Sequence, residues 1–199
     1  DVSDILLCSR KVKESTEIEK IRNACTILST TFANIDLFIE SGITEREASV
    51  RMITELVRKG ADDASCVVLS GPNTSIPHLE SSSKRIKKNE VVVTDAWCTY
   101  GGYFADVTRT VFTGQPDIEK RNMYNIVEKA QKKSINAVQD GVRVDKVDRA
   151  ARSIITMSGY GKYYTHRTGH GLGLDVHEGP YIQQGSESHL KQNMVVTIE

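Results

Sequence analysis

The sequence has 199 residues, which is enough for one sizeable hydrophobic core but short of two ordinary domains. Its 26 basic and 26 acidic side chains give a net charge of zero, which excludes the long-range field expected of a nucleic-acid or membrane-surface binder. The four cysteines contain no C-x-x-C pair, so neither a zinc knuckle nor a secreted disulfide framework is indicated. No apolar run reaches the length of a membrane span, and we expect a reducing, cytoplasmic location.

The first predicted helix begins with a capping box and carries one apolar stripe. Thr16 and Glu19 have the capping-box spacing, and Gly42 would end the helix. The stripe comprises Ile18, Ile21, Cys25, Leu28, Phe32, Ile35 and Ile39. Because these residues recur at steps of three and four, we expect the stripe, including Cys25, to lie in the core.

A shorter helix and three strands are predicted next. A second capping box, Thr44 with Glu47, opens the helix, and Gly60 follows its end. The segments predicted as strands are Ser65 to Ser70, Glu90 to Ala96 and Gly102 to Phe112.

The second half of the chain repeats this order. One helix is predicted from Pro116 to about Asp140 and a shorter one from Asp145 to Ser158. The matching pairs are Gly42 with Gly141, Gly60 with Gly159 and His78 with His177, each 99 residues apart, and Asp95 with Glu199, 104 residues apart. These offsets predict an α+β fold of two duplicated α-α-β units related by a pseudo-twofold axis, with a metal cluster at the central seam.

Two aspartates bracket a predicted β-hairpin. Asp95 closes an apolar run, and Asp106 follows the turn at Gly101 and Gly102. Aspartate is depleted inside strands, and an inward-facing acid there needs a partner such as a metal ion. Two ordinary strand-end aspartates are the alternative, and the spacing alone leaves both interpretations open.

Histidines and a second acidic strand end complete the pattern. His170 stands between two glycines, which would let bulky ligands approach closely, and His177 follows seven residues later. His166 is a weaker candidate, with a plain hydrogen-bonding role favoured. Glu199 ends the second apolar run. Carboxylates plus an imidazole suit a pair of divalent metals, and such a pair would hold a bridging hydroxide that could attack an amide carbonyl. His78 and His177 could then bind the carbonyl oxygen or the leaving nitrogen.

Four motifs occur together in this chain. They are Asp95 and Asp106 eleven residues apart, Gly169-His170-Gly171-Leu172-Gly173, His177-Glu178-Gly179-Pro180 and Thr197-Ile198-Glu199. By these motifs the chain resembles the pita-bread metallopeptidases (M24), which comprise methionine aminopeptidases, aminopeptidase P and prolidases, and the resemblance runs from about Lys13 to Glu199. The segments Gly171 to Glu178 and Arg10 to Ile18 look more like the Xaa-Pro branch of the family, prolidase and aminopeptidase P, than like methionine aminopeptidase.

The resemblance implies a role for each matching residue. Asp95 would chelate one metal, and Asp106 would bridge both. His170 and Glu199 would hold the second metal, with Glu199 also shuttling a proton. His78 and His177 would contact the substrate and stabilise the tetrahedral intermediate. The implied cofactors are two divalent ions, which could be manganese, cobalt, iron or zinc, with manganese favoured. The implied substrates are peptides or dipeptides with proline at the second position, and the implied assembly is a homodimer.

The resemblance also suggests a domain plan. Residues 1–14 would be a linker from an absent N-terminal domain, and residues 15–199 the catalytic domain, with halves 15–114 and 115–199. A fifth ligand, a bridging glutamate, would lie at about position 210, so we expect this piece alone to be weakly active or inactive. The alternatives are a methionine aminopeptidase, a non-catalytic pita-bread binding module and creatinase-like hydrolysis without metal.

Overall fold

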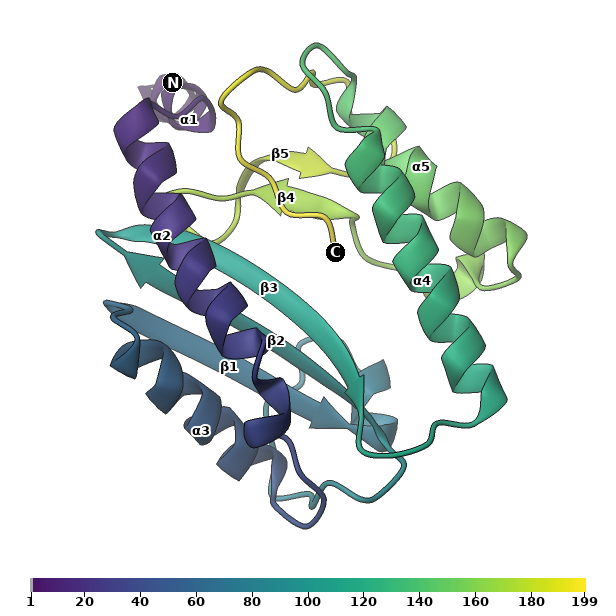
Figure 1. Ribbon diagram of the computed structural model, residues 1–199. Coiled ribbons are helices and arrows are strands. Elements are labelled where there is room, and N and C mark those ends of the chain that lie inside the picture. The colour runs from purple at the N-terminus through teal and green to yellow at the C-terminus, as the bar shows by residue number, and fades with distance from the viewer. Residues whose placement is uncertain (1) are drawn as a thin grey trace. The chain divides into compact units, whose positions relative to one another are not determined.

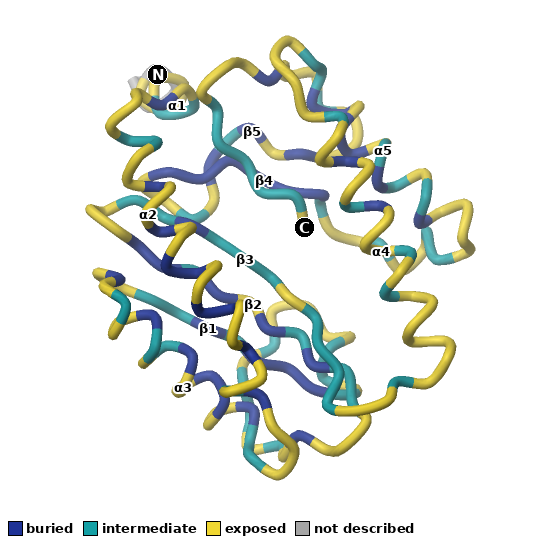
Figure 2. The backbone as a smooth tube through the Cα atoms, in the orientation of Figure 1, coloured by how far each residue is buried: buried dark blue, intermediate teal, exposed yellow. Residues whose placement is uncertain are grey.

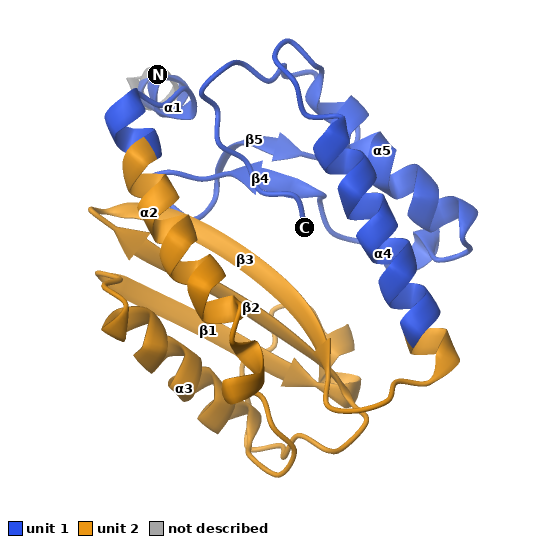
Figure 3. Cartoon of the chain, in the orientation of Figure 1, with its two compact units in different colours: residues 1–18, 121–199 blue, residues 19–120 orange. Residues whose placement is uncertain are grey.

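The structure is a computed structural model that describes residues 2–199, with side chains described from Leu6 onward. The chain forms two compact units, residues 19–120 and residues 1–18 with 121–199 (Figure 3). Among the described residues, no helix combines the length and the apolar character needed to cross a bilayer. The interpretation of residues 1–14 as a linker stays a prediction; most of them form helix α1, Val2–Lys11.

The unit of residues 19–120 is a three-stranded sheet with two helices packed on it (Figure 1). Its elements are α2 (Ser15–Phe32, which starts in the other unit), the short helix η1 (Ile35–Leu37), α3 (Glu45–Arg58), β1 (Asp63–Ser70), the short helix η2 (Gly71–Ser75), β2 (Val91–Tyr100) and β3 (Tyr103–Phe112). The strands pair antiparallel in the order β1-β2-β3. Val92, Ala96 and Cys98 of β2 are buried with α2 and α3 in one apolar core, so the alternate residues of β2 face away from the helices.

The second unit has a similar plan with shorter strands. Its further elements are α4 (Ile118–Asn136, which starts in the first unit), α5 (Val144–Met157), the short helix η3 (Gly161–Tyr163), β4 (Gly169–Gly171) and β5 (Glu178–Ile182). β4 pairs antiparallel with β5, and it is buried along its length (Figure 2). The last residues pair with β4 on its other side, through the amide of Thr197 donating to the carbonyl oxygen of His170 at 2.8 Å. Val196 and Ile198 pack against the buried cluster of Val144, Val147, Ile182 and Leu190 in this unit.

Backbone contacts inside each unit confirm the predicted duplication. The amide of Gly42 donates to the carbonyl oxygen of Ile86 at 2.8 Å, and the amide of Gly141 donates to that of Leu190 at the same distance. Both glycines have a positive φ, 102° and 74°, which glycine adopts readily. Further matching positions with positive φ are Gly60 and Gly159, and Asn89 and Asn193.

Three details of the first helix differ from the prediction. Helix α2 ends at Phe32, well before Gly42, which was expected to end it. Helix α2 begins at Ser15, not after Thr16, and the capping contact is the Glu17 carboxylate accepting from the amide of Glu14 at 2.8 Å. Cys25 is exposed, and Ala24 lies in the core in its place. The small Ala24 allows a close approach of β2, where the Cys98 thiol lies 3.5 Å from the Ala24 carbonyl oxygen.

Candidate metal centre

The β2–β3 hairpin brings Asp95 and Asp106 to one face of its sheet. Gly101 and Gly102 form the turn with φ angles of 58° and 80°, as the sequence predicted. Asp95 pairs with Thr108 across the strands, and Asp106 pairs with Trp97. Directly paired residues share a face, so the two carboxylates are diagonal neighbours. They lie on the face away from the helices, where the apolar core does not cover them.

Two neighbours of these carboxylates shape that face. The Thr108 hydroxyl donates to Asp95 Oδ1 at 2.5 Å. Trp97 is half-buried directly opposite Asp106, and its ring centroid lies 5.2 Å from that of Phe104. Sequence reasoning left the role of Trp97 open between core and pocket wall, and the strand register places it beside the carboxylates. Thr108 was missed, because a threonine in a strand carries no distinctive signal.

His170 of the second unit faces Glu199. The His170 side chain is buried, with Nδ1 2.9 Å from the carbonyl oxygen of Gly171. With a metal bound, a proton on Nδ1 would serve that bond and leave a lone pair on Nε2, the arrangement that a metal-ligating histidine needs. Nε2 lies 2.8 Å from Glu199 Oε1. An imidazole nitrogen facing a carboxylate oxygen suits a cation bound by both, so this donor pair fits a divalent metal.

Strand alternation also directs Glu199. Because Val196 and Ile198 point into the core, Thr197 and Glu199 point to the opposite face. The Thr197 hydroxyl donates to Glu199 Oε1 at 2.7 Å. Burial raises the pKa of the Glu199 carboxyl. The contacts with His170 and Thr197 together lower it by a larger amount, so the pKa lies below its ordinary value. Glu199 is therefore a carboxylate at neutral pH.

The glycines beside His170 allow close backbone packing. A Cβ at Gly169 would lie 2.0 Å from the carbonyl oxygen of Thr197, and one at Gly171 would lie 2.4 Å from that of Gly179. Neither position can hold a side chain without moving a neighbouring strand. This explanation differs from the ligand access that the sequence suggested.

Three other candidate histidines occupy different settings. His177 is exposed, and its ring centroid lies 4.3 Å from that of His170. His78 is exposed in the other unit, with a φ of 58°. His166 hydrogen-bonds through Nδ1 with the carbonyl oxygen of Arg167 at 2.6 Å, and its ring meets the edge of Tyr164. That contact agrees with the plain hydrogen-bonding role favoured for His166.

A buried acid on α5 supports the strand that carries His170. Asp148 accepts hydrogen bonds from the Thr168 hydroxyl at 2.7 Å and from Arg152 at 2.8 Å. The carbonyl oxygen of Thr168 in turn accepts from the amide of Glu199 at 2.8 Å. Sequence reasoning missed this support, although an acid on the buried face of an amphipathic helix is a detectable signal.

His170, His177 and Glu199 lie together in one unit. Asp95 and Asp106 lie on one face of the sheet in the other unit. His78 is the remaining predicted residue, and it lies on the segment that follows η2.

Comparison with known proteins adds independent findings. The chain matches the model of metallopeptidase family M24 over residues 19–199. It is 36% identical over 200 residues to the Xaa-Pro dipeptidase of Pyrococcus furiosus, covering 100% of this chain and 57% of the relative. The solved prolidase from Thermococcus sibiricus matches with a TM-score of 0.97 at 40% identity, covering 99% of this chain and 55% of that one. The X-Pro aminopeptidase from Thermotoga maritima matches with a TM-score of 0.94 at 36% identity, covering 98% and 56%.

These matches confirm the pita-bread fold expected from the sequence. The chain spans just over half the length of the curated relative and of both solved proteins. The family match covers most of the chain and includes every predicted site residue. The chain therefore belongs to metallopeptidase family M24, whose members use divalent metal ions.

Proposed function

We propose that the protein carrying this chain is a metal-dependent peptidase that hydrolyses the Xaa-Pro bond at the N-terminus of peptides or dipeptides. The contact between His170 Nε2 and Glu199 Oε1 carries the proposal, because it pairs a ligating imidazole with an ionised carboxylate. The similarity to an Xaa-Pro dipeptidase, a prolidase and an X-Pro aminopeptidase supports the substrate class.

Four side chains would hold two divalent ions. Asp95 would chelate one ion, Asp106 would bridge both, and His170 with Glu199 would hold the second. Manganese is favoured, since carboxylate-rich sites suit this ion. When bound, such ions acidify the water that they share and polarise a carbonyl oxygen.

The chain's own residues would then orient the substrate and move protons. Thr108 and Thr197 hold the carboxylates of Asp95 and Glu199 through their hydroxyl groups. Glu199 would accept the proton of the attacking water and deliver it to the leaving nitrogen. His177 and His78 would donate hydrogen bonds to the developing oxyanion or to the leaving group.

We also propose a reducing, cytoplasmic location and a homodimer. The location is supported by the cysteines, none of which forms a disulfide in the part of the chain that the structure describes. The homodimer rests on the family resemblance alone, and sedimentation of the whole protein tests it. The net charge of zero supports the absence of a nucleic-acid partner.

The test uses the whole protein, stripped of metal and reloaded with manganese, cobalt, iron or zinc. The substrates are an Xaa-Pro dipeptide, a longer Xaa-Pro peptide and a Met-Ala peptide. We expect metal-dependent cleavage of an Xaa-Pro bond, with bound metal and activity both lost in His170→Ala. His189→Ala is the matched control, because His189 is an exposed histidine of the same unit outside the site.

Other outcomes would select an alternative. Preference for the Met-Ala peptide indicates a methionine aminopeptidase. Neither bound metal nor hydrolysis indicates a binding module, and hydrolysis by the metal-free protein indicates a creatinase-like reaction. Cleavage of dipeptides only, or also of longer peptides, separates dipeptidase from aminopeptidase P.

A further inference from the structure

A buried carboxylate outside the candidate metal centre lies at the start of α3. Glu45 is the first residue of this helix, directly after the cap Thr44, and its exposed fraction is 0%. A buried carboxylate is costly unless it is hydrogen-bonded. Glu45 takes no part in the proposed chemistry, so its partners indicate what it does.

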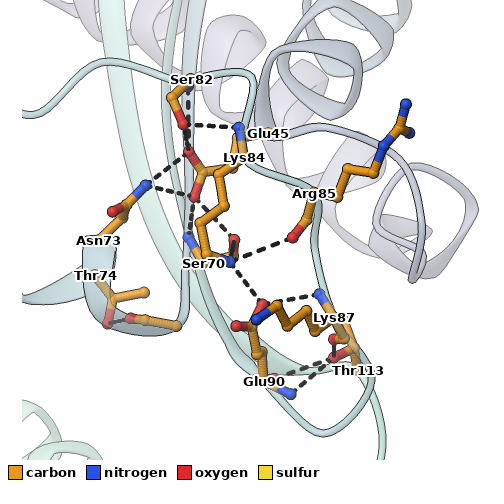
Figure 4. Close-up of polar contacts among 11 residues, drawn as sticks. Glu45, Ser70, Asn73, Thr74, Ser82, Lys84, Arg85, Lys87, Glu90 and Thr113 are labelled. Carbon is orange, nitrogen blue, oxygen red and sulfur yellow. Dashed lines mark hydrogen bonds and ion pairs between the residues drawn. The ribbon is translucent and has the colours of Figure 1, made fainter.

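The partners of Glu45 lie at both ends of one loop (Figure 4). Oε1 accepts hydrogen bonds from the amide and the hydroxyl of Ser70, at 2.7 and 2.8 Å. Oε2 accepts from the amide and the hydroxyl of Ser82, at 3.1 and 2.6 Å. The Asn73 side chain donates to both oxygens at 3.1 Å. One carboxylate therefore holds the two ends and an internal residue of segment 71–81.

Segment 71–81 carries His78 in a conformation that needs support. His78 has a φ of 58°, in the left-handed region that residues with a side chain rarely adopt. Such a conformation persists only where the surroundings fix it. Besides Glu45, the Ser81 hydroxyl ties the segment to β1 by accepting from the amide of Val68 at 2.8 Å. Lys84 adds a bond to the Ser70 hydroxyl at 2.7 Å.

The duplicated half shows that the fold itself does not need a carboxylate at this position. The amide of Glu45 donates to the carbonyl oxygen of Lys84 at 3.0 Å, and the amide of Val144 donates to that of Ser188 at 2.8 Å. Val144 is therefore the counterpart of Glu45, and it is buried in an apolar core. An α-α-β unit forms with valine there, so the carboxylate serves the segment that carries His78.

The Glu45 carboxyl is ionised at neutral pH. Burial raises its pKa, but the hydrogen bonds from Ser82 and Ser70 together lower it by a larger amount. The pKa therefore lies below its ordinary value. A carboxylate accepts at both oxygens, whereas the amide of glutamine presents donors on one side. Glu45→Gln therefore keeps the volume of the side chain and breaks one of the two attachments.

We propose that Glu45 is a positioning residue that fixes both ends of segment 71–81 and thereby places His78 against the substrate. This inference rests on the proposed function, in which His78 contacts the substrate. Glu45 acts through His78, so removing His78 should remove the catalytic effect of Glu45.

A double-mutant cycle in the metal-loaded whole protein tests this dependence. We expect Glu45→Gln and His78→Ala each to lower kcat/KM for an Xaa-Pro substrate by about tenfold or more, since small misplacements of this kind are costly. In the His78→Ala background, Glu45→Gln should change kcat/KM by less than about twofold, because residues that act as a unit are non-additive. Separate kcat and KM values should change in the same way in the two single variants.

Two further measurements keep the test independent of folding and of activity. Glu47→Gln removes an exposed capping carboxylate from the same helix without touching segment 71–81, and it should leave kcat/KM unchanged. Ser82→Ala is the milder variant if Glu45→Gln does not fold. Hydrogen exchange of the amides in residues 71–82 should accelerate in Glu45→Gln, while exchange in α5 stays as in the wild type.

The outcomes separate the two proposals. If the wild type hydrolyses Xaa-Pro substrates and Glu45→Gln lowers kcat/KM equally with and without His78, only the positioning role is overturned. The positioning role is also overturned if amide hydrogen exchange in residues 71–82 of Glu45→Gln equals that of the wild type. It is overturned, too, if His78→Ala keeps the kcat/KM of the wild type. No hydrolysis by the wild type overturns the proposed function and, with it, this inference.

Discussion

Asp95 lies on β2 and Glu199 at the matching position in the last residues, which pair with β4, and each has a threonine hydroxyl beside it. Thr108 donates to Asp95 from the neighbouring strand at 2.5 Å, whereas Thr197 donates to Glu199 from two residues earlier at 2.7 Å. A hydrogen bond to the charged form favours that form and fixes its orientation. The duplication thus preserves the carboxylates, while each half supplies the hydroxyl group from a different place.

Replacing one hydroxyl group tests its effect on metal binding. Thr108→Val keeps the shape of the side chain and removes the donor to Asp95, and we expect metal affinity to fall roughly tenfold, the smaller effect typical of residues that orient ligands. Calorimetric titration of the metal-free whole protein with manganese measures the change. Thr110→Val, two residues along the same face of β3, is the matched control. Equal losses in both variants would contradict a specific role for Thr108.

The proposed ligand residues stand out in the sequence because they break a local pattern. Asp95 closes an apolar run inside β2, and His170 stands among glycines. Thr108 and Glu45 break no pattern, since threonine is common in strands and glutamate is common in the first turn of a helix. Their partners lie on neighbouring strands or loops, and only the folded chain reveals those contacts.

At the scale of elements, β4 depends on close backbone approach on both sides. Gly169→Ala would place a Cβ 2.0 Å from the carbonyl oxygen of Thr197, so the last residues would have to shift away from β4. We expect a loss of about 1–3 kcal/mol in the free energy of unfolding, the usual cost of overpacking. Urea unfolding of the whole protein measures it.

Gly179→Ala is the control for this substitution. Its nearest neighbour would be the flexible end of the Lys11 side chain at 3.0 Å, which can move aside. The control should therefore lose less stability than Gly169→Ala. A smaller loss for Gly169→Ala than for Gly179→Ala would show that β4 tolerates a side chain.

Glu45 also links α3 to β1, and this link should depend on pH. Its pKa is lower in the folded protein than in the unfolded chain, so its stabilisation is present above the unfolded pKa of about 4.3 and is lost as pH falls through the folded pKa. We expect Glu45→Gln to lower the free energy of unfolding by about 1–3 kcal/mol at pH 7. The difference from the wild type should shrink below about pH 4. A difference that stays constant between pH 7 and pH 3 would contradict this assignment.

Elements with local signals were predicted better than elements that depend on distant partners. The capping box of Thr44 and Glu47 is present as predicted, and α3 ends within two residues of Gly60. The strand β4 was not predicted, because Gly169 to Gly171 is short and has no apolar alternation, and its pairing with β5 and with Val196 forms only in the folded chain. The start of α2 was misplaced by two residues, Glu17 instead of Ser15, because two overlapping Glu spacings, from residues 14 and 16, both resemble a capping box.

At the scale of the whole molecule, the duplicated units share backbone contacts but differ in their cores. The unit of residues 19–120 has one large apolar cluster, while the other unit divides its described apolar residues into two smaller clusters. Repeated glycines made the shared backbone plan predictable from the sequence. The distribution of apolar contacts was not predictable, because it depends on which side chains meet after folding.

The N-terminal segment is joined to the end of the chain in the second of these units. The amide of Lys13 donates to the carbonyl oxygen of Asn193 at 3.0 Å. The Lys13 ammonium lies 3.4 Å from Glu178, and the two side chains are only 1% and 5% exposed. Arg10 also contacts Glu178. Burial lowers the pKa of Lys13 despite the attraction of Glu178, which indicates a costly desolvation that the pair must offset.

Burial, rather than distance, should decide how much an ion pair stabilises this protein. Lys13→Met leaves the buried Glu178 with Arg10 alone, and we expect a loss of about 3 kcal/mol in the free energy of unfolding. Lys132→Met breaks the shorter but exposed pair with Glu128, at 2.8 Å, and should cost less than about 0.5 kcal/mol. Adding Glu178→Gln to Lys13→Met should recover part of the loss, because it removes a buried charge that Arg10 alone offsets only in part. Guanidinium unfolding of the whole protein measures the free energy of unfolding of all three variants. A larger loss of this free energy in Lys132→Met than in Lys13→Met would mean that the buried pair does not hold the N-terminal segment in place.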